Sequence, residues 1–133
     1  MKTETISQSV TLPARPAAVY AALMNAKKHA GFTGAPAAID ARVGGAMSCY
    51  GPYIKGVTLD LVLAKRIVQA WRSRDWPPGF YSVVTFALSP APGGKTRLRF
   101  TQLGVPAGDV KAKKAGWKSH YWEPLKRYLG AKK

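Results

Sequence analysis

The chain is poor in the residues that build metal and catalytic sites. Its 133 residues contain one cysteine, two histidines and only six aspartates and glutamates. Cys49 has no partner for a disulfide, which fits a reducing compartment, and we expect it to be a small buried side chain. His29 and His120 have no partner at metal-ligand spacing. These shortages predict no metal, no cofactor and no catalytic residue.

Long apolar runs are also missing. No stretch approaches the roughly 20 apolar residues that a membrane-spanning helix needs, and the first ten residues, MKTETISQSV, lack the apolar segment of a signal peptide. Because hydrophobic residues still make up 47% of the chain, it has enough material for a core. We therefore expect a cytoplasmic protein with one domain over residues 1–133.

The scarcity of acids leaves a large positive excess. Twenty-one lysines and arginines give a formal net charge of +15. Such a charge attracts polyanions, which include nucleic acid, an anionic membrane surface or an acidic protein. Since net charge informs association and not fold, a simply solvated surface remains the alternative.

The hydrophobic pattern predicts an α+β chain. It begins with a half-buried strand at Thr5–Leu12 and two short helices at Ala17–Met24 and Ala26–Thr33. Apolar positions then alternate, with Val57, Leu59, Leu61 and Leu63 expected on the dry face of one strand. The six strands of this region are expected at Ala37–Arg42, Ala46–Tyr50, Ile54–Leu63, Arg66–Arg72, Phe80–Leu88 and Thr96–Leu103.

A long helix is expected from Ala107 to Leu129. Trp117, Tyr121, Leu125 and Tyr128 fall within an arc of about 80° on it, and Pro124 should kink it. A bent sheet with one apolar face needs a cover, and only this helix is long enough. The prediction is a curved antiparallel sheet of six to seven strands with the long helix packed across its concave face and a cavity between them.

Aromatic and apolar side chains gather where this cavity is expected. Walls of this kind suit a flat or apolar ligand, whereas the alternative is that the same side chains simply fill the core. The candidate ligand-binding residues are Phe32, Met47, Tyr50, Trp71, Phe86, Phe100, Trp117 and Tyr121.

Basic residues supply the candidate partner-binding surface. Four arginines are expected on the outer face of the sheet, and two lysines lie close to the apolar arc, where they would rim the pocket and attract a carboxylate. Because no exposed aromatics are interleaved with them, we expect no specific nucleic-acid binding. The candidates are Arg72, Arg74, Arg97, Arg99, Lys114 and Lys118.

Several short motifs, in order, carry a resemblance to a known family. They are Gly44-Gly45, Lys55-Gly56, Ile67-Val68-Gln69-Ala70-Trp71-Arg72, Asp75-Trp76-Pro77, Val84-Thr85-Phe86, Gly104-Val105-Pro106, Gly116-Trp117 and Tyr121-Trp122-x-x-Leu125-Lys126. The set resembles the C-terminal domain of activators of the heat-shock protein 90 ATPase, within the START-like (SRPBCC) helix-grip superfamily that includes the birch-pollen allergen. The resemblance covers about residues 6–130.

The resemblance implies a non-catalytic binding protein of helix-grip fold. It implies a heat-shock protein 90-type chaperone or another acidic protein as partner, or an apolar small molecule as ligand. The eukaryotic activators also carry an N-terminal domain that makes most of the chaperone contact, and the resemblance does not extend to it. Relatives in the wider superfamily leave a lipid or polyketide carrier, or a cyclase-like enzyme that uses the cavity, as alternatives.

Overall fold

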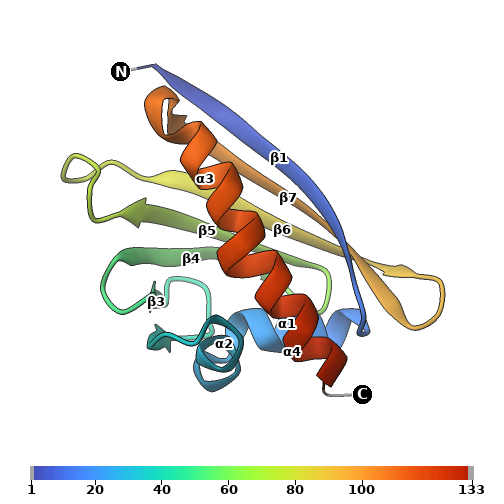
Figure 1. Ribbon diagram of the computed structural model, residues 1–133. Helices are drawn as coiled ribbons and strands as arrows, with labels where there is room; N and C mark the ends of the chain where they lie inside the picture. The colour runs from blue at the N-terminus through green and yellow to red at the C-terminus, as the bar shows by residue number, and fades with distance from the viewer. Residues whose placement is uncertain (1, 132–133) are drawn as a thin grey trace.

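One antiparallel sheet and one long helix dominate the structure, a computed structural model that describes residues 2–131. The long helix crosses one face of the sheet diagonally (Figure 1). The sheet has the strand order β1-β7-β6-β5-β4-β3-β2. Its strands are β1 (Thr3–Leu12), β2 (Ala37–Ile39), β3 (Ala46–Cys49), β4 (Ile54–Val62), β5 (Arg66–Ser73), β6 (Ser82–Ala91) and β7 (Lys95–Pro106).

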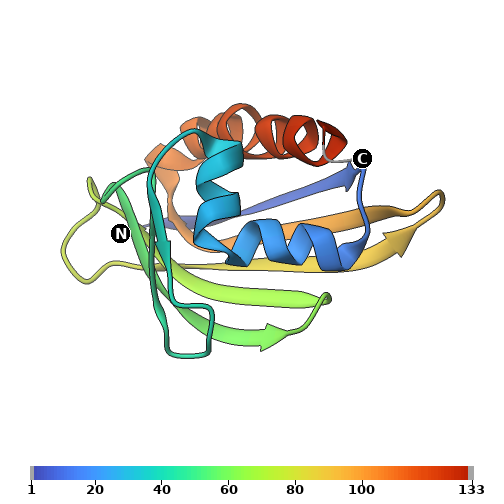
Figure 2. The same cartoon turned by 90° about the horizontal axis from the view of Figure 1, so that it is seen from below.

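All the helices lie on one side of this sheet, and the strands curve around them (Figure 2). Two short helices connect β1 to β2, and four helical segments follow β7 without a break. Within residues 2–131, no helix has both the length and the apolar character needed to cross a membrane. The segments are α1 (Pro16–Met24), α2 (Ala26–Thr33), the 3₁₀ turn η1 (Ala107–Asp109), α3 (Val110–Trp117), the π-helical turn η2 (Lys118–Trp122) and α4 (Glu123–Ala131).

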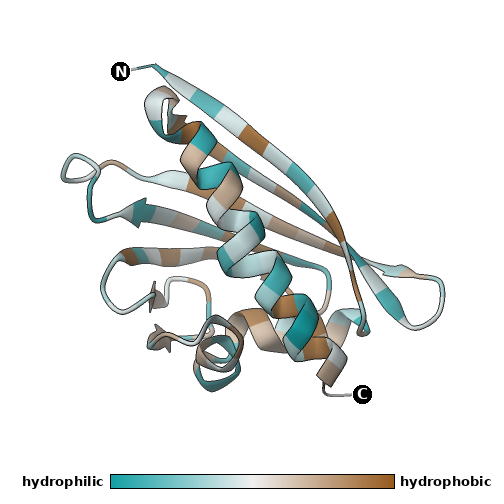
Figure 3. Cartoon of the chain, viewed as in Figure 1, coloured by the Kyte–Doolittle hydropathy of each residue, from teal (hydrophilic) through white to brown (hydrophobic). Residues whose placement is uncertain are grey.

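The topology is a meander to which the first strand is added at one edge. Strands β2 to β7 pair with their sequence neighbours, and β1 pairs along β7. Figure 3 shows the alternation of β1 as brown bands between white and teal ones. The predicted α+β helix-grip class, with two short helices and a long terminal one, is confirmed.

Local chemistry explains where the short helices begin and end. Pro16 stands at the first position of α1, where its missing N–H costs nothing. The Asn25 side chain accepts a hydrogen bond of 3.0 Å from the backbone N–H of Lys28 and so caps α2. Gly34 ends α2 with a φ of 74°, in the left-handed region that glycine tolerates best.

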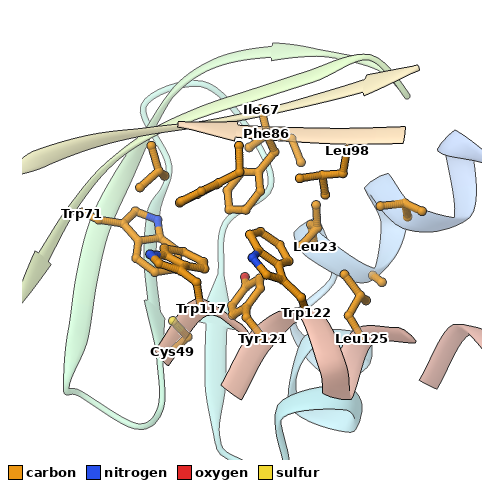
Figure 4. Packing of buried hydrophobic residues seen from close by; sticks show 14 of the residues in the cluster. Leu23, Cys49, Ile67, Trp71, Phe86, Leu98, Trp117, Tyr121, Trp122 and Leu125 are labelled. Atoms are coloured by element: carbon orange, nitrogen blue, oxygen red, sulfur yellow. The ribbon is translucent and has the colours of Figure 1, made fainter. Parts of the chain in front are cut away.

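The core lies between the long helix and the concave face of the sheet. Trp117 and Tyr121 are buried against Phe86, as Figure 4 shows, and Leu125 is fully buried on the same helix. The ring centroids of Phe100 and Trp117 are only 4.2 Å apart. Aromatic side chains bury large areas and dominate such cores. The predicted contact between the ring-bearing stripe and the sheet is therefore confirmed.

The predicted dry face of β4 is wrong. Ile54 and Thr58 point into the core, whereas Leu59 and Leu63 are 45% and 77% exposed and Val57 is only half-buried. A bulge between Thr58 and Asp60 then shifts the register, so that Leu61 packs against the core again. A shift of one residue exchanges the two faces of a strand. The large apolar side chains of β4 therefore lie mostly on its uncovered face.

Candidate functional site

A pocket of about 310 Å³ opens beside the buried aromatic cluster. It lies between the turn that joins β3 to β4, the end of β5 and the first half of the long helix, elements that can be followed in Figure 1. Its floor is formed by Trp71 and Trp117, whose rings pack at a centroid distance of 5.0 Å (Figure 4). Tyr53 and Trp76 also line it. The walls are therefore mainly aromatic.

Half of the predicted cavity residues line this pocket. Tyr50, Trp71, Trp117 and Tyr121 do so. The other four do not line this pocket and belong to the buried core beside it. These four are Phe32, Met47, Phe86 and Phe100, each at most 6% exposed.

Glutamine side chains hold the tryptophans in place. Trp71, Trp117 and Trp122 each donate an indole N–H to a glutamine Oε1 at 2.8 Å, and the acceptors are Gln69, Gln102 and Gln8. These are the only glutamines in the sequence. Buried polar groups need such partners to avoid a desolvation cost. The network therefore fixes the orientation of the rings that form the pocket floor.

Two further hydrogen bonds extend this network across the sheet. The amide of Gln102 donates to Ser82 Oγ at 2.9 Å, and Ser82 Oγ donates to the Trp71 carbonyl at 3.1 Å. The two floor tryptophans are therefore linked through side chains of β6 and β7. Gln102 lines the pocket but was not among the predicted residues, although its inward position follows from its place two residues after Phe100.

A hydrogen bond from Tyr50 to the long helix, here called the latch, holds one side of the pocket mouth. Pro124 has no N–H to donate to the carbonyl of His120, its partner one helical turn earlier. The Tyr50 hydroxyl donates to that carbonyl instead. Tyr50 occupies the turn after β3 with a φ of 54°, which is uncommon outside glycine. The turn between β3 and β4 is thus tied to the helix across the pocket.

Pro124 also affects the shape of the helix. The expected kink takes the form of the π-helical turn η2, immediately before α4, in which the Glu123 N–H reaches back five residues to the Lys118 carbonyl. Turns of this kind insert an extra residue into a helix and often occur at functional sites. Here the extra residue lets Trp117 and Trp122 both face the sheet, with their rings stacked at 5.4 Å.

Lys113 provides a cation in the pocket wall. Its ammonium donates to Ser73 Oγ at 2.7 Å and lies 3.9 Å from Asp109 Oδ2. It also stands over the rings of Tyr53 and Trp76, at 5.3 and 5.7 Å from their centroids. Cations over aromatic faces are attracted by the ring electrons. Only 19% of the Lys113 side chain is exposed, so its charge acts in a partly desolvated setting.

The expectation that Lys114 and Lys118 rim the pocket is wrong. Both are exposed, and the pocket is lined instead by Lys113. Lys113 precedes Trp117 by four residues and therefore shares its face of the helix. That spacing is the signal in the sequence that would have identified it.

Two tyrosines, one cysteine and one histidine in or beside the pocket are held in their neutral forms near pH 7. Burial raises the pKa of Tyr50 to about 12, together with repulsion from the Cys49 thiolate that forms in the same pH range, and burial also raises the pKa of Tyr121 well above its usual value. Burial raises the pKa of the Cys49 thiol to about 12 and lowers the pKa of His29 to about 4. Cys49 is fully buried, as predicted.

Acidic groups contribute nothing to the pocket wall itself. Within residues 2–131, no carboxylate lines the pocket and no cluster of His, Cys, Asp and Glu could hold a metal ion. Two carboxylates lie nearby but are engaged: Asp75 accepts from the Tyr53 hydroxyl and Asp109 from the Trp76 indole, at 2.8 and 2.9 Å. The arrangement is suited to holding a ligand in an aromatic environment.

The candidate arginines divide into two groups at opposite ends of the outer face. Arg99 lies in register with Ala87 on β6 and, through it, with Arg66 on β5. Arg97 is two residues along β7 from Arg99 and, like it, is exposed. Arg72 is six residues along β5 from Arg66, a separation of roughly 20 Å. The arginines expected to form one basic surface therefore do not.

The second group is only partly free. The Arg72 guanidinium donates to the carbonyls of Trp76 and Pro77 at 2.9 and 2.6 Å, which fixes the loop after β5. Arg74 lies over the Tyr53 ring at 5.8 Å from its centroid. Arg72 thus supports the pocket mouth, while Arg97 and Arg99 remain the freer cations.

The chain is similar in sequence to several known proteins. Residues 13–130 match the family model described as Activator of Hsp90 ATPase homolog 1-like protein. The human Activator of 90 kDa heat shock protein ATPase homolog 1 is 33% identical over 99 residues, which are 74% of this chain and 29% of the human protein. An uncharacterized protein of Schizosaccharomyces pombe is 32% identical over 98% of this chain and 38% of its own length. The chain thus spans well under half of these two relatives.

Solved structures extend the comparison. An Hsp90 activator from Plasmodium falciparum superposes with a TM-score of 0.89 at 25% identity, covering 95% of this chain and 96% of that one. CalU16 from Micromonospora echinospora reaches a TM-score of 0.80 at 19% identity, over 96% of this chain and 76% of that one. The second likeness concerns the fold alone.

Proposed function

Because the chain belongs to the family of Activator of Hsp90 ATPase homolog 1-like proteins, we propose that it is a non-catalytic domain that binds an Hsp90-type chaperone and stimulates its ATPase. The likeness to the Plasmodium falciparum activator carries this proposal, because it extends over nearly the whole of both chains. One buried thiol, Cys49, suits the reducing cytoplasm in which we place the protein.

The charge of the chain supports an acidic partner surface. A net charge of +15 speeds the encounter with a negatively charged protein and makes binding sensitive to salt. The outer face of the sheet presents Arg97 and Arg99 on β7, neither of which has an ion-pair partner among residues 2–131. We place the chaperone contact on this end of the outer face.

An ATPase titration tests the proposal. The chain is added to the Hsp90-type chaperone of the same organism, and ATP turnover is measured at low and at physiological salt. We expect turnover to rise with saturation, and the half-saturating concentration to increase steeply with salt. No binding and no change in turnover at low salt would refute the chaperone function.

Charge-reversal variants locate the contact. Arg97→Glu with Arg99→Glu should weaken chaperone binding at least tenfold, whereas Lys111→Glu with Lys114→Glu, on the helical side of the sheet, should have a smaller effect. The two pairs change the net charge equally and all four residues are exposed. Equal losses would show that overall charge, and not the β7 arginines, is responsible.

The pocket favours a second candidate function, a small-molecule carrier or sensor. A volume of about 310 Å³ with mainly aromatic walls is at the lower end of known ligand sites. Native mass spectrometry of protein purified from its host should then reveal a co-purifying ligand. A cyclase-like enzyme has less support, because no carboxylate in the described chain lines the pocket.

A further inference from the structure

We propose that the pocket binds a flat aromatic carboxylate, whose ring lies against Trp71 and Trp117 and whose carboxylate is held by the Lys113 ammonium. This inference rests on the second candidate function above and adds the charge and shape of the ligand. Two features of the pocket carry it: the orientation of its rings and the donors left on its single lysine.

The rings form rigid surfaces for a flat ligand. Trp117 is held by Gln102 and Trp71 by Gln69, so neither indole is free to turn. Opposite them, Tyr53 and Trp76 complete the aromatic wall at the mouth. Fixed aromatic surfaces bind planar rings without paying side-chain entropy on binding. An extended flexible chain would gain less from such walls than a fused ring.

Lys113 has donors to spare. An ammonium carries three N–H groups, and within residues 2–131 this one makes a single hydrogen bond, to Ser73 Oγ. Asp109, at 3.9 Å, is too distant for a hydrogen bond and already accepts from the Trp76 indole. A ligand carboxylate near Ser73 would complete the coordination of the ammonium.

The sign of the ligand charge follows from the wall composition. Lys113 and Arg72 line the pocket, and no carboxylate of the described residues does. A cationic ligand would meet two positive charges, and a ligand without an anionic group would leave the spare N–H groups of the ammonium without a charged acceptor. A hydrogen bond between an ammonium and a carboxylate is about twice as strong as a neutral one, and partial burial strengthens it further.

The test compares two probes of the same shape by titration calorimetry on the full chain. The first is 2-naphthoate, and the second is 2-naphthylmethanol, which lacks the charge. We expect 2-naphthoate to bind at least tenfold more tightly, since hydrogen bonds to charged groups are worth more than one factor of ten. The indole N–H signals of Trp71 and Trp117 should shift in NMR spectra, and that of Trp122, which lies outside the pocket, should not.

Lys113→Met should remove the preference for 2-naphthoate while retaining binding of the neutral alcohol. The matched control is Lys114→Met, which makes the same charge change one residue away on an exposed side chain. Circular dichroism checks that both variants fold. If Lys114→Met weakened 2-naphthoate as much as Lys113→Met, the anchor would be wrong.

A second pair of variants tests the location. Gly116 lines the pocket within α3, and a Cβ added there meets only His120 Cδ2, at 3.9 Å. Gly116→Leu should therefore fill the pocket and abolish binding of both probes, whereas Gly116→Ala should bind nearly as the native chain does. Binding that survives Gly116→Leu would place the site elsewhere and overturn the inference.

The remaining outcomes separate the inference from the function beneath it. Equal affinity of the two probes for the native chain would overturn the carboxylate anchor and leave the carrier function standing. Failure of both probes to bind would overturn the anchor and count against the carrier function as well. Neither result would bear on the chaperone proposal, which concerns the outer face of the sheet.

Discussion

Lowering the pH from 7.5 to 4.5 should destabilise this protein mainly through one side chain, His29. The ring is 1% exposed and packs against Phe32 and Tyr121. Its Nε2 shares a hydrogen bond of 2.7 Å with the Tyr121 hydroxyl, while its buried Nδ1 has no hydrogen-bond partner. A protonated ring would carry a buried N–H without an acceptor, so the neutral form is strongly favoured.

The size of the effect follows from the pKa. Burial lowers the pKa of His29 from 6.5 to about 4, so the unfolded chain takes up a proton at this ring before the folded chain does. The stability that the neutral ring contributes is complete above pH 6.5 and is lost as the pH falls toward 4. Each pH unit in this window costs about 1.4 kcal/mol, and the loss approaches about 3 kcal/mol, a large share of a typical domain stability.

Urea denaturation followed by tryptophan fluorescence, at one-unit steps between pH 7.5 and 4.5, measures this loss. His29→Gln retains a polar group beside the Tyr121 hydroxyl but does not titrate, so it should flatten the pH dependence. His120→Gln, at the exposed histidine, should retain the native slope. The six carboxylates are the same in all three proteins and cancel in the comparison. Parallel pH profiles for the native chain and His29→Gln would refute the reasoning.

Three further predictions concern the latch, the glutamines and the thiol. Tyr50→Phe should lower the free energy of unfolding by about 1 kcal/mol. The loss should be much smaller in a Pro124→Ala background, because a backbone N–H then becomes available to the carbonyl of His120. Additive effects of the two substitutions would contradict the proposed hydrogen bond from Tyr50 to that carbonyl. Gln102→Leu should lower the free energy of unfolding, measured by urea denaturation, by about 2–4 kcal/mol, because two buried groups lose a hydrogen-bond partner. Gln8→Leu should lower it by about half as much, because it removes the acceptor of one part-buried indole. Equal losses would contradict the proposed role of the glutamine network. Cys49, whose pKa burial raises to about 12, should resist iodoacetamide near pH 8 in the folded chain and react in urea; rapid labelling of the folded protein would show that the thiol is accessible.

The fold could be predicted from the sequence because its signals are local. Alternating apolar residues located the strands, and the spacing of Trp117, Tyr121 and Leu125 located the buried face of the long helix. The face of β4 could not be predicted in this way. Its bulge depends on pairing with β5 across the sheet, and no sequence pattern near Leu59 predicts it. The larger apolar side chains of β4 then led to the wrong face.

The site could be predicted only in part, for a similar reason. Whether an inward aromatic lines a pocket or fills the core depends on how the helix is set against the sheet. Here the π turn brings Trp117 and Trp122 onto the sheet together, which closes the space over Phe86 and Phe100 and leaves a pocket beside Trp71. An ideal helical projection contains no such turn.

The two proposed functions use opposite faces of the sheet and lie at opposite ends of it. Trp71 faces the pocket. The guanidinium of its neighbour Arg72 donates a hydrogen bond to the carbonyl of Trp76 in the loop after β5, and Trp76 also lines the pocket. By contrast, Arg97 and Arg99 lie at the far end of the outer face, about 20 Å along the strands. Substitutions of the β7 arginines therefore leave the pocket residues untouched, and Lys113→Met leaves the outer face untouched. Chaperone binding and ligand binding can accordingly be tested separately in the same chain, and a change at Arg72 should affect the pocket alone.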